Sequence, residues 1–416
     1  MEGPVGSGGA AKAAGDSRGR GPGPLDGVVV LDFTQVELGP CATQMLGDFG
    51  ADVIKIERPK VGDLAREHMK HPSGESAVFW SLNRNKRSVA IDIRTPLGRE
   101  AILRLVLRAD VLVHNFRPGV MERLGFGPEE LRRLNPRLIY AVGSGYGPDG
   151  PYKDKGGQDV LAQAMSGIAA RRPDPNAPPE PSSTAVADFT AGMLLVQGIL
   201  LALIARERTG QGQVVHASLL DGMLAMQLQE ASAWLNLKER LNWGAFPLSG
   251  TFATTDGHVV MVGAFKPNPL REICRGLGIE DLSLDPRFAT HQDQVAHRDE
   301  LQARFREEFR KRSTAEAVAA LESVDILVSR VNTLEEVLQD PQVAHNGMVV
   351  EMRHPAYGAM RTVGIPLKLD GTPGTLRLPP PLLGEHTAEV LGELGFSADE
   401  ITDLMSPDRA RTGSAT

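Results

Sequence analysis

Short apolar runs alternate with segments of helical periodicity over the first third of the chain. Runs rich in β-branched residues, typical of buried strands, occupy residues 28–33, 52–57, 88–93, 110–116 and 137–142. Between them, apolar residues recur at helical spacing, most clearly over 96–108 and 128–134, and a proline suits the first turn of each. Strands that alternate with helices in this way predict an α/β fold with a mainly parallel sheet.

The first strand-helix-strand unit, residues 28–57, has the order of a nucleotide-binding fold but lacks its glycine fingerprint. Pro40 suits the first turn of the helix, and Gly50 can end it. A dinucleotide site places G-x-G-x-x-G between strand and helix, whereas only Gly39 lies in this turn. Glu57 ends the second strand where a ribose-binding carboxylate would lie, although strand ends often carry a solvated glutamate.

The pattern changes beyond the fifth predicted strand. Helical periodicity covers 159–170 and 188–208, and the second segment predicts a long, largely buried helix. The proline-rich segment 171–183 between them must cross the surface or line a cleft, because its prolines exclude a helix and a central strand. Later segments predict a hairpin, two charged amphipathic helices and two closing helices, at 250–263, 298–312, 314–323, 383–394 and 398–405.

The length of 416 residues favours two domains over one compact core. We expect a large domain over 25–220, a smaller α+β domain over 221–328, and a segment, 329–416, that returns to the large domain. Residues 1–24 are rich in Gly, Ala and Pro, without an apolar segment, and predict a disordered tail and no secretory signal. Arg18 and Arg20 leave a mitochondrial transit peptide as the less favoured alternative to a cytoplasmic location.

Composition excludes several classes of function. The net charge of −7 and the dispersed arginines argue against general nucleic-acid binding. We expect no membrane helix, since no uncharged run reaches the required ~18 residues. Cys41 and Cys274 are too few for a disulfide framework, which fits a reducing, cytoplasmic compartment. His68 and His71 have no third ligand nearby at metal spacing, so we expect no metal site.

Asp188 is the first candidate for chemistry, because it lies at the N-cap or in the first turn of the long apolar helix. A carboxylate here can simply cap the helix. It can also be a nucleophile that the helix dipole keeps ionised. Both roles use the same geometry, so the position alone leaves both open.

Cations follow several of the predicted strands. Arg58, Arg94 and Arg117 lie where the carboxyl ends of parallel strands meet, and Arg123 and Lys155 lie in nearby loops. Singly, each is an ordinary solvated charge; together they suit a ligand held by its phosphates through side chains. The glycine-rich segment 143–147 is a plain turn, because the prolines after it prevent an immediate helix, and the chain has no G-x-S-x-G nucleophile elbow.

Six segments in this order resemble the class III CoA-transferases, the family of formyl-CoA transferase and carnitine CoA-transferase, which also includes α-methylacyl-CoA racemase. The resemblance extends from about residue 25 to 405. It rests on 31–59 (LDFTQVELGPCATQMLGDFGADVIKIERP), 83–93 (NRNKRSVAIDI), 109–119 (ADVLVHNFRPG), 135–140 (NPRLIY), 209–213 (TGQGQ) and 382–391 (LLGEHTAEVL).

The resemblance implies an acyl-CoA:carboxylate CoA-transferase with a Rossmann-like large domain, a smaller domain and an interlocked homodimer. Its substrates would be an acyl-CoA and a carboxylic acid, with no permanently bound cofactor and no metal. Asp188 falls on the catalytic aspartate, which would form mixed anhydrides and an aspartyl-CoA thioester. The positions that it places around coenzyme A are Glu37, Leu38, Arg58, Ile91, Arg94, Asn115, Phe116, Arg117, Arg123, Lys155 and Gln158.

The chain departs from the family pattern at two places. Formyl-CoA transferases carry a glutamine where this chain has Glu37, and a glycine-rich loop that is missing around 246–258, which puts oxalate in doubt as the acceptor. Racemases carry a histidine where this chain has Gln158, and without an imidazole the proton shuttle at Cα loses its base. Transfer is therefore favoured over the alternative, a racemase or epimerase.

The acceptor acid is poorly specified by the sequence. Arg171 and Arg172 open the proline-rich loop, and His68 lies in a loop that the resemblance places near the substrate. These residues suggest a dicarboxylate acceptor, although solvated arginines on a surface loop explain the pattern equally well.

Overall fold

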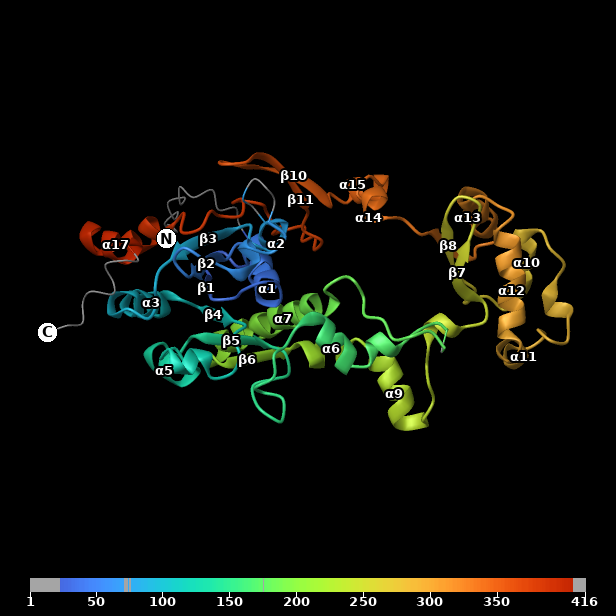
Figure 1. The fold of residues 1–416 in the computed structure, drawn as a ribbon, viewed down its shortest axis with the longest axis horizontal. Helices are drawn as coiled ribbons and strands as arrows, with labels where there is room; N and C mark the ends of the chain where they lie inside the picture. Colours follow the sequence, from blue (N-terminus) through green and yellow to red (C-terminus); the bar gives the residue numbers. More distant parts are fainter. Residues whose placement is uncertain (1–22, 71–73, 75, 175, 407–416) are drawn as a thin grey trace, which may run out of the picture. The chain divides into compact units, whose positions relative to one another are not determined.

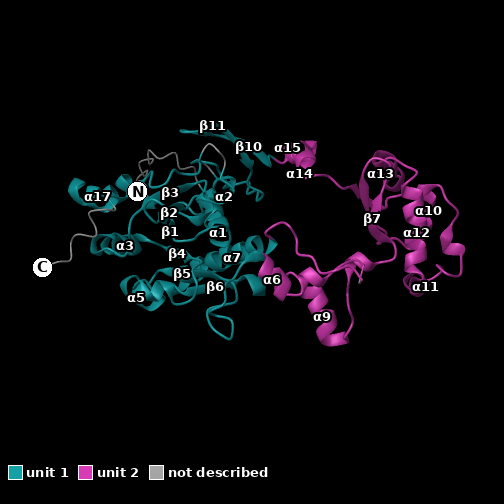
Figure 2. Cartoon of the chain, in the orientation of Figure 1, with its two compact units in different colours: residues 1–159, 186–222, 347–416 teal, residues 160–185, 223–346 magenta. Residues whose placement is uncertain are grey.

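The computed structural model describes residues 23–70, 74, 76–174 and 176–406. The chain divides into two compact units, which are described separately (Figure 1, Figure 2). Unit 1 comprises residues 1–159, 186–222 and 347–416, and unit 2 comprises 160–185 and 223–346. The tail expected at 1–24 lies almost wholly outside the described residues, and the domain boundaries expected from the sequence stay a prediction.

A six-stranded parallel sheet forms the centre of unit 1, in the order β3-β2-β1-β4-β5-β6 (Figure 1). Its strands are β1 (Val29–Asp32), β2 (Asp52–Glu57), β3 (Lys86–Ala90), β4 (Val111–His114), β5 (Ile139–Ser144) and β6 (Val214–Ser218). The expected α/β class with a parallel sheet is confirmed. The sequence missed β6, because its five residues include a histidine and a serine and show no clear apolar run.

Helices connect these strands and cover the sheet. They are α1 (Leu38–Asp48), α2 (Ala77–Leu82), α3 (Pro96–Arg108), α4 (Val120–Arg123), α5 (Pro128–Leu134), α7 (Val186–Thr209), α16 (Thr387–Glu393) and α17 (Ala398–Met405), with a 3₁₀ turn at Leu64–Arg66. Two helices pass from unit 1 into unit 2: α6 (Asp159–Met165), of which only Asp159 belongs to unit 1, and α8 (Leu219–Ala225). A two-stranded hairpin, β10 (Val349–His354) and β11 (Gly358–Val363), completes unit 1. The apolar core lies between the sheet and α3, α5 and α16, where Leu31, Leu105 and Leu391 are buried.

The long helix α7 corrects the expectation that no segment is apolar enough for a membrane. By length and composition alone, its 24 residues could span one. Within unit 1, however, α7 packs on α1, β5 and β6, and Ala191, Leu195 and Ile199 are fully buried. It is therefore a core helix, which explains an apolar pattern that extends around most of its circumference.

Unit 2 contains a three-stranded antiparallel sheet of β7 (Ser249–Ala253), β8 (His258–Val262) and β9 (Leu327–Arg330). Phe252 packs on Phe305 and Phe309 in its core. The hairpin and helices expected here are present. The helices of unit 2 are α9 (Leu228–Leu237), α10 (Pro269–Leu277), α11 (His291–Ala296), α12 (Arg298–Phe309), α13 (Thr314–Glu322), α14 (Leu334–Val337) and α15 (Pro341–His345), and its 3₁₀ turns are Ile168–Ala170, Trp243–Ala245 and Leu282–Leu284.

Candidate active site

Two adjoining cavities lie at the carboxyl edge of the parallel sheet, where open α/β sheets bind ligands. Cavity A, of about 590 Å³, is lined by the segments that follow β2 and β3. Cavity B, of about 350 Å³, is lined by the segments that follow β4 and β5 and by the start of α7. Gln35 and Phe116 line both cavities. The site therefore lies across β1 and β4, where the strand order reverses direction.

The cavities collect most of the residues predicted around coenzyme A. Cavity A takes Arg58, Ile91 and Arg94, and Phe116 lines both cavities. Cavity B takes Leu38, Asn115, Arg117, Lys155, Gln158 and the candidate nucleophile Asp188. Glu37 and Arg123 line neither cavity.

The cations of the site differ in how firmly they are held. Arg58 is exposed at the wall of cavity A. Arg94 is also exposed, but its guanidinium pairs with the Asp92 carboxylate at 2.7 Å. In cavity B, the Lys155 ammonium lies 3.9 Å from the centre of the Tyr152 ring, a cation–π contact. These charges stand at the rim, where a polyanion can reach them without first displacing a buried ion pair.

The turn between β1 and α1 contributes to the lining of both cavities and is held at three successive residues, Thr34 to Val36. The side-chain amide of Asn115 both accepts from the Gln35 N–H at 2.9 Å and donates to the Gln35 carbonyl at 2.7 Å. Thr34 donates its N–H to Asp32 at 2.8 Å. The Val36 N–H donates to Asp63 at 2.9 Å. Asn115 thus pairs with the backbone as a neighbouring strand would.

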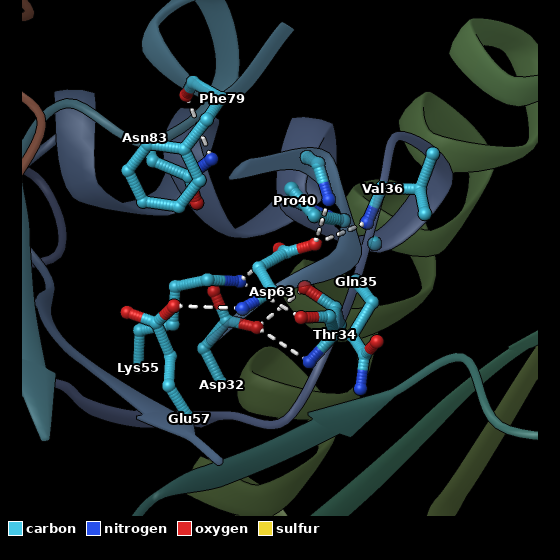
Figure 3. A network of polar contacts seen from close by, with 12 residues as sticks. Asp32, Thr34, Gln35, Val36, Pro40, Lys55, Glu57, Asp63, Phe79 and Asn83 are labelled. Carbon is cyan, nitrogen blue, oxygen red and sulfur yellow. Dashed lines mark hydrogen bonds and ion pairs between the residues drawn. The ribbon is translucent and has the colours of Figure 1, made fainter. Parts of the chain in front are cut away.

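A buried ionic network lies beneath this turn (Figure 3). Lys86 pairs with Asp32 at 3.1 Å and Lys55 pairs with Asp63 at 2.8 Å, and all four side chains are fully buried. Burial alone would raise the pKa of Asp32, but Lys55 and Lys86 outweigh it and lower that pKa to about 2. Burial lowers the pKa of Lys86 to about 8, against the opposing effect of Asp32. The network fixes the turn through charges that water does not screen.

Asp188 lies in the first turn of α7 and is not its cap. Asp159 accepts the Ala187 N–H at 2.7 Å and the Asp188 N–H at 3.0 Å, so Asp159 supplies the capping carboxylate. The Asp188 carboxyl instead lines cavity B beside Leu38, the first residue of α1, whose backbone amide lowers the pKa of this carboxyl. This carboxyl group therefore lies at the amino-terminal ends of two helices.

The surroundings of Asp188 raise its pKa to about 7. Burial is the largest cause, followed by the negative charges of Glu37 and Asp159, while the hydrogen bond from Leu38 opposes them. Burial and Asp159 also raise the pKa of Glu37. A carboxylate with a pKa this close to neutrality is a much stronger nucleophile than an ordinary aspartate, and it is still ionised in part at neutral pH.

Glu57 has no free oxygen for a ribose. Its carboxylate accepts two hydrogen bonds from Arg66 at 2.8 Å, one from the Ser88 hydroxyl at 2.6 Å and one from the Asp63 N–H at 2.9 Å. Glu57 instead anchors the loop after β2, which carries Arg58.

The glycines of the site allow close backbone contacts. A Cβ on Gly145 would lie 2.6 Å from the Gly157 Cα, so the turn 143–147 crosses a second loop. A Cβ on Gly39 would lie 2.3 Å from the Thr34 methyl group, so Gly39 lets α1 start close to β1. Segment 143–147, expected to be a plain turn, begins with the last two residues of β5, and all five of its residues line cavity B.

Sequence reasoning missed the residues beneath the turn and assigned no part to Asp159. The only available signal for Lys55 and Lys86 was a lysine within each of two strands of a parallel sheet, where both faces are usually apolar. Asp63 and Val36 gave no local signal. Their contact joins two loops that lie 27 residues apart, and only the fold brings them together.

Arg171, Arg172 and His68, the residues that suggested a dicarboxylate, have other surroundings than expected. In unit 2, Arg171 pairs with Glu230 at 3.4 Å and Arg172 pairs with Glu180 at 2.6 Å. His68, in unit 1, is exposed and lines neither cavity. Within the described ranges, no group of three or more His, Cys, Asp or Glu side chains is arranged to hold a metal ion.

The fold and site define an α/β protein of the nucleotide-binding type with a buried carboxyl group in its cavity, and comparison with known proteins gives its family. The model of CoA-transferase family III matches residues 25–387. The chain belongs to this family, and it is an acyl-CoA:carboxylate CoA-transferase.

Relatives match over nearly the whole chain. A succinyl-CoA–D-citramalate CoA-transferase from Chloroflexus aurantiacus is 34% identical, over 93% of this chain and 98% of the relative. A formyl-CoA:oxalate CoA-transferase from Escherichia coli O157:H7 is 35% identical, over 92% of this chain and 98% of the relative. The crystal structure of a CaiB/BaiF family protein from Brucella suis is 32% identical, with a TM-score of 0.81 over 90% of this chain and 100% of that one.

Proposed function

We propose that Asp188 is the nucleophile of the transfer reaction. The observation that carries this proposal is its position, since the carboxyl group lines cavity B at the amino-terminal ends of α1 and α7, beside two further carboxyl groups. Helix dipoles favour the anion, while burial and like charge make it reactive. Asp188 is not needed as a helix cap, because Asp159 already caps α7.

The reaction then exchanges carboxylate and thioester four times. The Asp188 carboxylate attacks the donor thioester carbonyl, giving a mixed anhydride and CoA thiolate. The thiolate attacks the Asp188 carbonyl, which releases the donor acid and leaves an aspartyl-CoA thioester. The acceptor carboxylate attacks this thioester, and the released thiolate then attacks the acceptor carbonyl of the new anhydride. The products are the acceptor acyl-CoA and free Asp188.

Coenzyme A would lie across the two cavities, with its phosphates near the exposed Arg58 and Arg94 of cavity A and its thioester in cavity B. Three observations support this orientation. Cavity A has no glycine fingerprint, its exposed cations suit phosphates, and the two cavities adjoin at Gln35 and Phe116. Ile91 and Phe116 supply apolar wall. Arg117, Lys155 and Gln158 would contact the remainder of the molecule in cavity B.

The acceptor in this proposal is a dicarboxylic acid. Lys153, which also lines cavity B and is not assigned to coenzyme A, is available to a second carboxylate. Two relatives are named for transfer to the dicarboxylates D-citramalate and oxalate. Arg171 and Arg172 are not part of the argument, since each pairs with a glutamate of unit 2.

A homodimer also belongs to this proposal. Helix α9 of unit 2 has no buried residue, and Leu228, Leu235 and Leu237 are each at least 65% exposed. An apolar face of this kind on a described helix is typical of a protein interface. A second copy of the chain is the occupant that the family resemblance implies.

Mass spectrometry of the protein after incubation with an acyl-CoA tests the nucleophile. We expect a covalent CoA adduct that peptide mapping assigns to Asp188, and none in Asp188→Ala, while the exposed control Asp149→Asn keeps it. Succinate-like acids should discharge the adduct faster than monocarboxylic acids. An adduct on another residue would falsify the assignment of Asp188 as the nucleophile. Faster discharge by monocarboxylic acids would show that the acceptor is not a dicarboxylic acid.

A further inference from the structure

Val36 has a backbone conformation that its side chain disfavours. Its φ of +65° lies in the left-handed region, which a β-branched residue rarely enters. The residue lies in the turn between β1 and α1, directly before Glu37 and Leu38. Backbone conformations of this kind persist only where the surrounding structure holds them, and they concentrate at functional sites.

Asp63 is the side chain that holds Val36 (Figure 3). One of its carboxylate oxygens accepts the Val36 N–H and the Ala65 N–H, each at 2.9 Å. The other oxygen lies 2.8 Å from the Lys55 ammonium, and both side chains are fully buried. Lys55 also donates to the Thr34 carbonyl at 2.8 Å, so the pair holds the turn at two residues.

We propose that Asp63, fixed by Lys55, is a positioning residue that sets the geometry of the nucleophile by holding Val36 in its left-handed conformation. The inference rests on the proposed role of Asp188. Val36 and Leu38 line cavity B together with Asp188. Rotation of Val36 toward an ordinary conformation would redirect the following residues and move the start of α1 relative to the Asp188 carboxyl. Asn115 holds the backbone of Gln35, which precedes Val36. The backbone displacement would therefore affect the residues after Val36, at the start of α1.

The same residue also connects the two cavities. Asp63 ends the loop that begins with Arg58, and its N–H donates to Glu57 at 2.9 Å. The loop expected to contact coenzyme A in cavity A therefore carries the carboxylate that fixes the turn beside Asp188 in cavity B. No residue from 58 to 63 lines cavity B, where the proposed reaction takes place, so Asp63 is a positioning residue.

A double-mutant comparison separates positioning from simple stabilisation. We expect Asp63→Ala to lower kcat by about 30-fold, since small displacements in an active site can cost about 100-fold, with a smaller change in KM for the acyl-CoA. Glycine enters the left-handed region without strain. In a Val36→Gly background, Asp63→Ala should therefore cost only about 3-fold in kcat, a tenfold smaller effect. Asp63→Asn keeps a hydrogen-bond acceptor for the Val36 N–H, so its kcat should lie between those of the wild type and Asp63→Ala. This variant replaces Asp63→Ala in the comparison if Asp63→Ala does not fold.

Asp48→Asn is the matched control. Asp48 lies at the other end of α1 in a buried pair with Arg84 at 2.6 Å, so its loss should lower stability and leave kcat unchanged below the unfolding transition. An equal cost of Asp63→Ala in both backgrounds, or an equal loss of kcat in Asp48→Asn, overturns the inference. The adduct on Asp188 is scored independently in each variant. An adduct on a different residue defeats the proposed function, whereas an adduct on Asp188 with no background dependence defeats only the inference.

Discussion

Three carboxyl groups, those of Glu37, Asp159 and Asp188, lie together at the amino-terminal ends of α1 and α7. Their mutual repulsion and their burial hold the pKa of Asp188 at about 7. Asp159 has two separate effects, because it caps α7 through two backbone amides and also contributes negative charge. The residue that the sequence identified thus depends for its reactivity on two neighbours that the sequence did not connect to it.

Replacing Glu37 should change the pH dependence of the reaction. Asp188 must be ionised to attack, so kcat/KM should fall as the pH falls through about 7. Glu37→Gln removes a negative charge that raises the pKa of Asp188, so we expect the acidic limb to move to lower pH. The measurement is the pH profile of kcat/KM, with the exposed Glu129→Gln as control. A limb that stays in place in Glu37→Gln would contradict the electrostatic account.

At the scale of elements, the site depends on close packing of α1 on α7. A Cβ on Gly192 of α7 would lie 2.8 Å from the Leu38 carbonyl oxygen. Because Leu38 and Asp188 line the same cavity, the distance between these two helices also affects the position of the proposed nucleophile.

Gly192→Ala should therefore be destabilising, although glycine to alanine within a helix ordinarily stabilises by about 1 kcal/mol. We expect a loss of about 1–3 kcal/mol from overpacking, together with a lower kcat. Chemical denaturation and steady-state kinetics measure both. Gly392→Ala in α16 is the control, since a Cβ there meets no atom within 4 Å and should stabilise. Stabilisation by Gly192→Ala would show that the helices tolerate a wider separation.

At the scale of the whole molecule, the exposed apolar face of α9 bears on assembly. Leu235 is 69% exposed in the described chain, and its neighbours on α9 include Trp234 and Leu228. An interface with a second copy would bury this face. A charged side chain on this face would then destabilise the dimer much more than it destabilises the folded monomer.

Leu235→Glu should shift the protein from dimer toward monomer, measured by sedimentation at several concentrations. The control is Leu107→Glu on α3, where the side chain is 57% exposed on a helix of unit 1. A dimer that is equally stable in wild type and in Leu235→Glu would remove α9 from the interface. A monomeric wild type would refute the homodimer itself.

The sequence by itself determined the features that local patterns encode. Apolar runs predicted five of the six parallel strands, and proline starts predicted α3 and α5 with their observed bounds. The absence of a glycine fingerprint indicated a nucleotide fold that uses side chains, and strand ends indicated where Arg58, Arg94 and Arg117 would lie. These features need only propensity, periodicity and the rule that parallel strands share a carboxyl edge.

The tertiary structure decided what depends on contacts between distant segments. It placed Asp159 as the cap of α7, directed Asp188 toward the start of α1, and buried Lys55 and Asp63 beneath a turn in which Val36 lies 27 residues before Asp63. Each of these contacts joins segments that are unrelated in local pattern, and their energies arise from burial that a chain acquires only on folding. The sequence located the proposed nucleophile, and the fold gave it its environment.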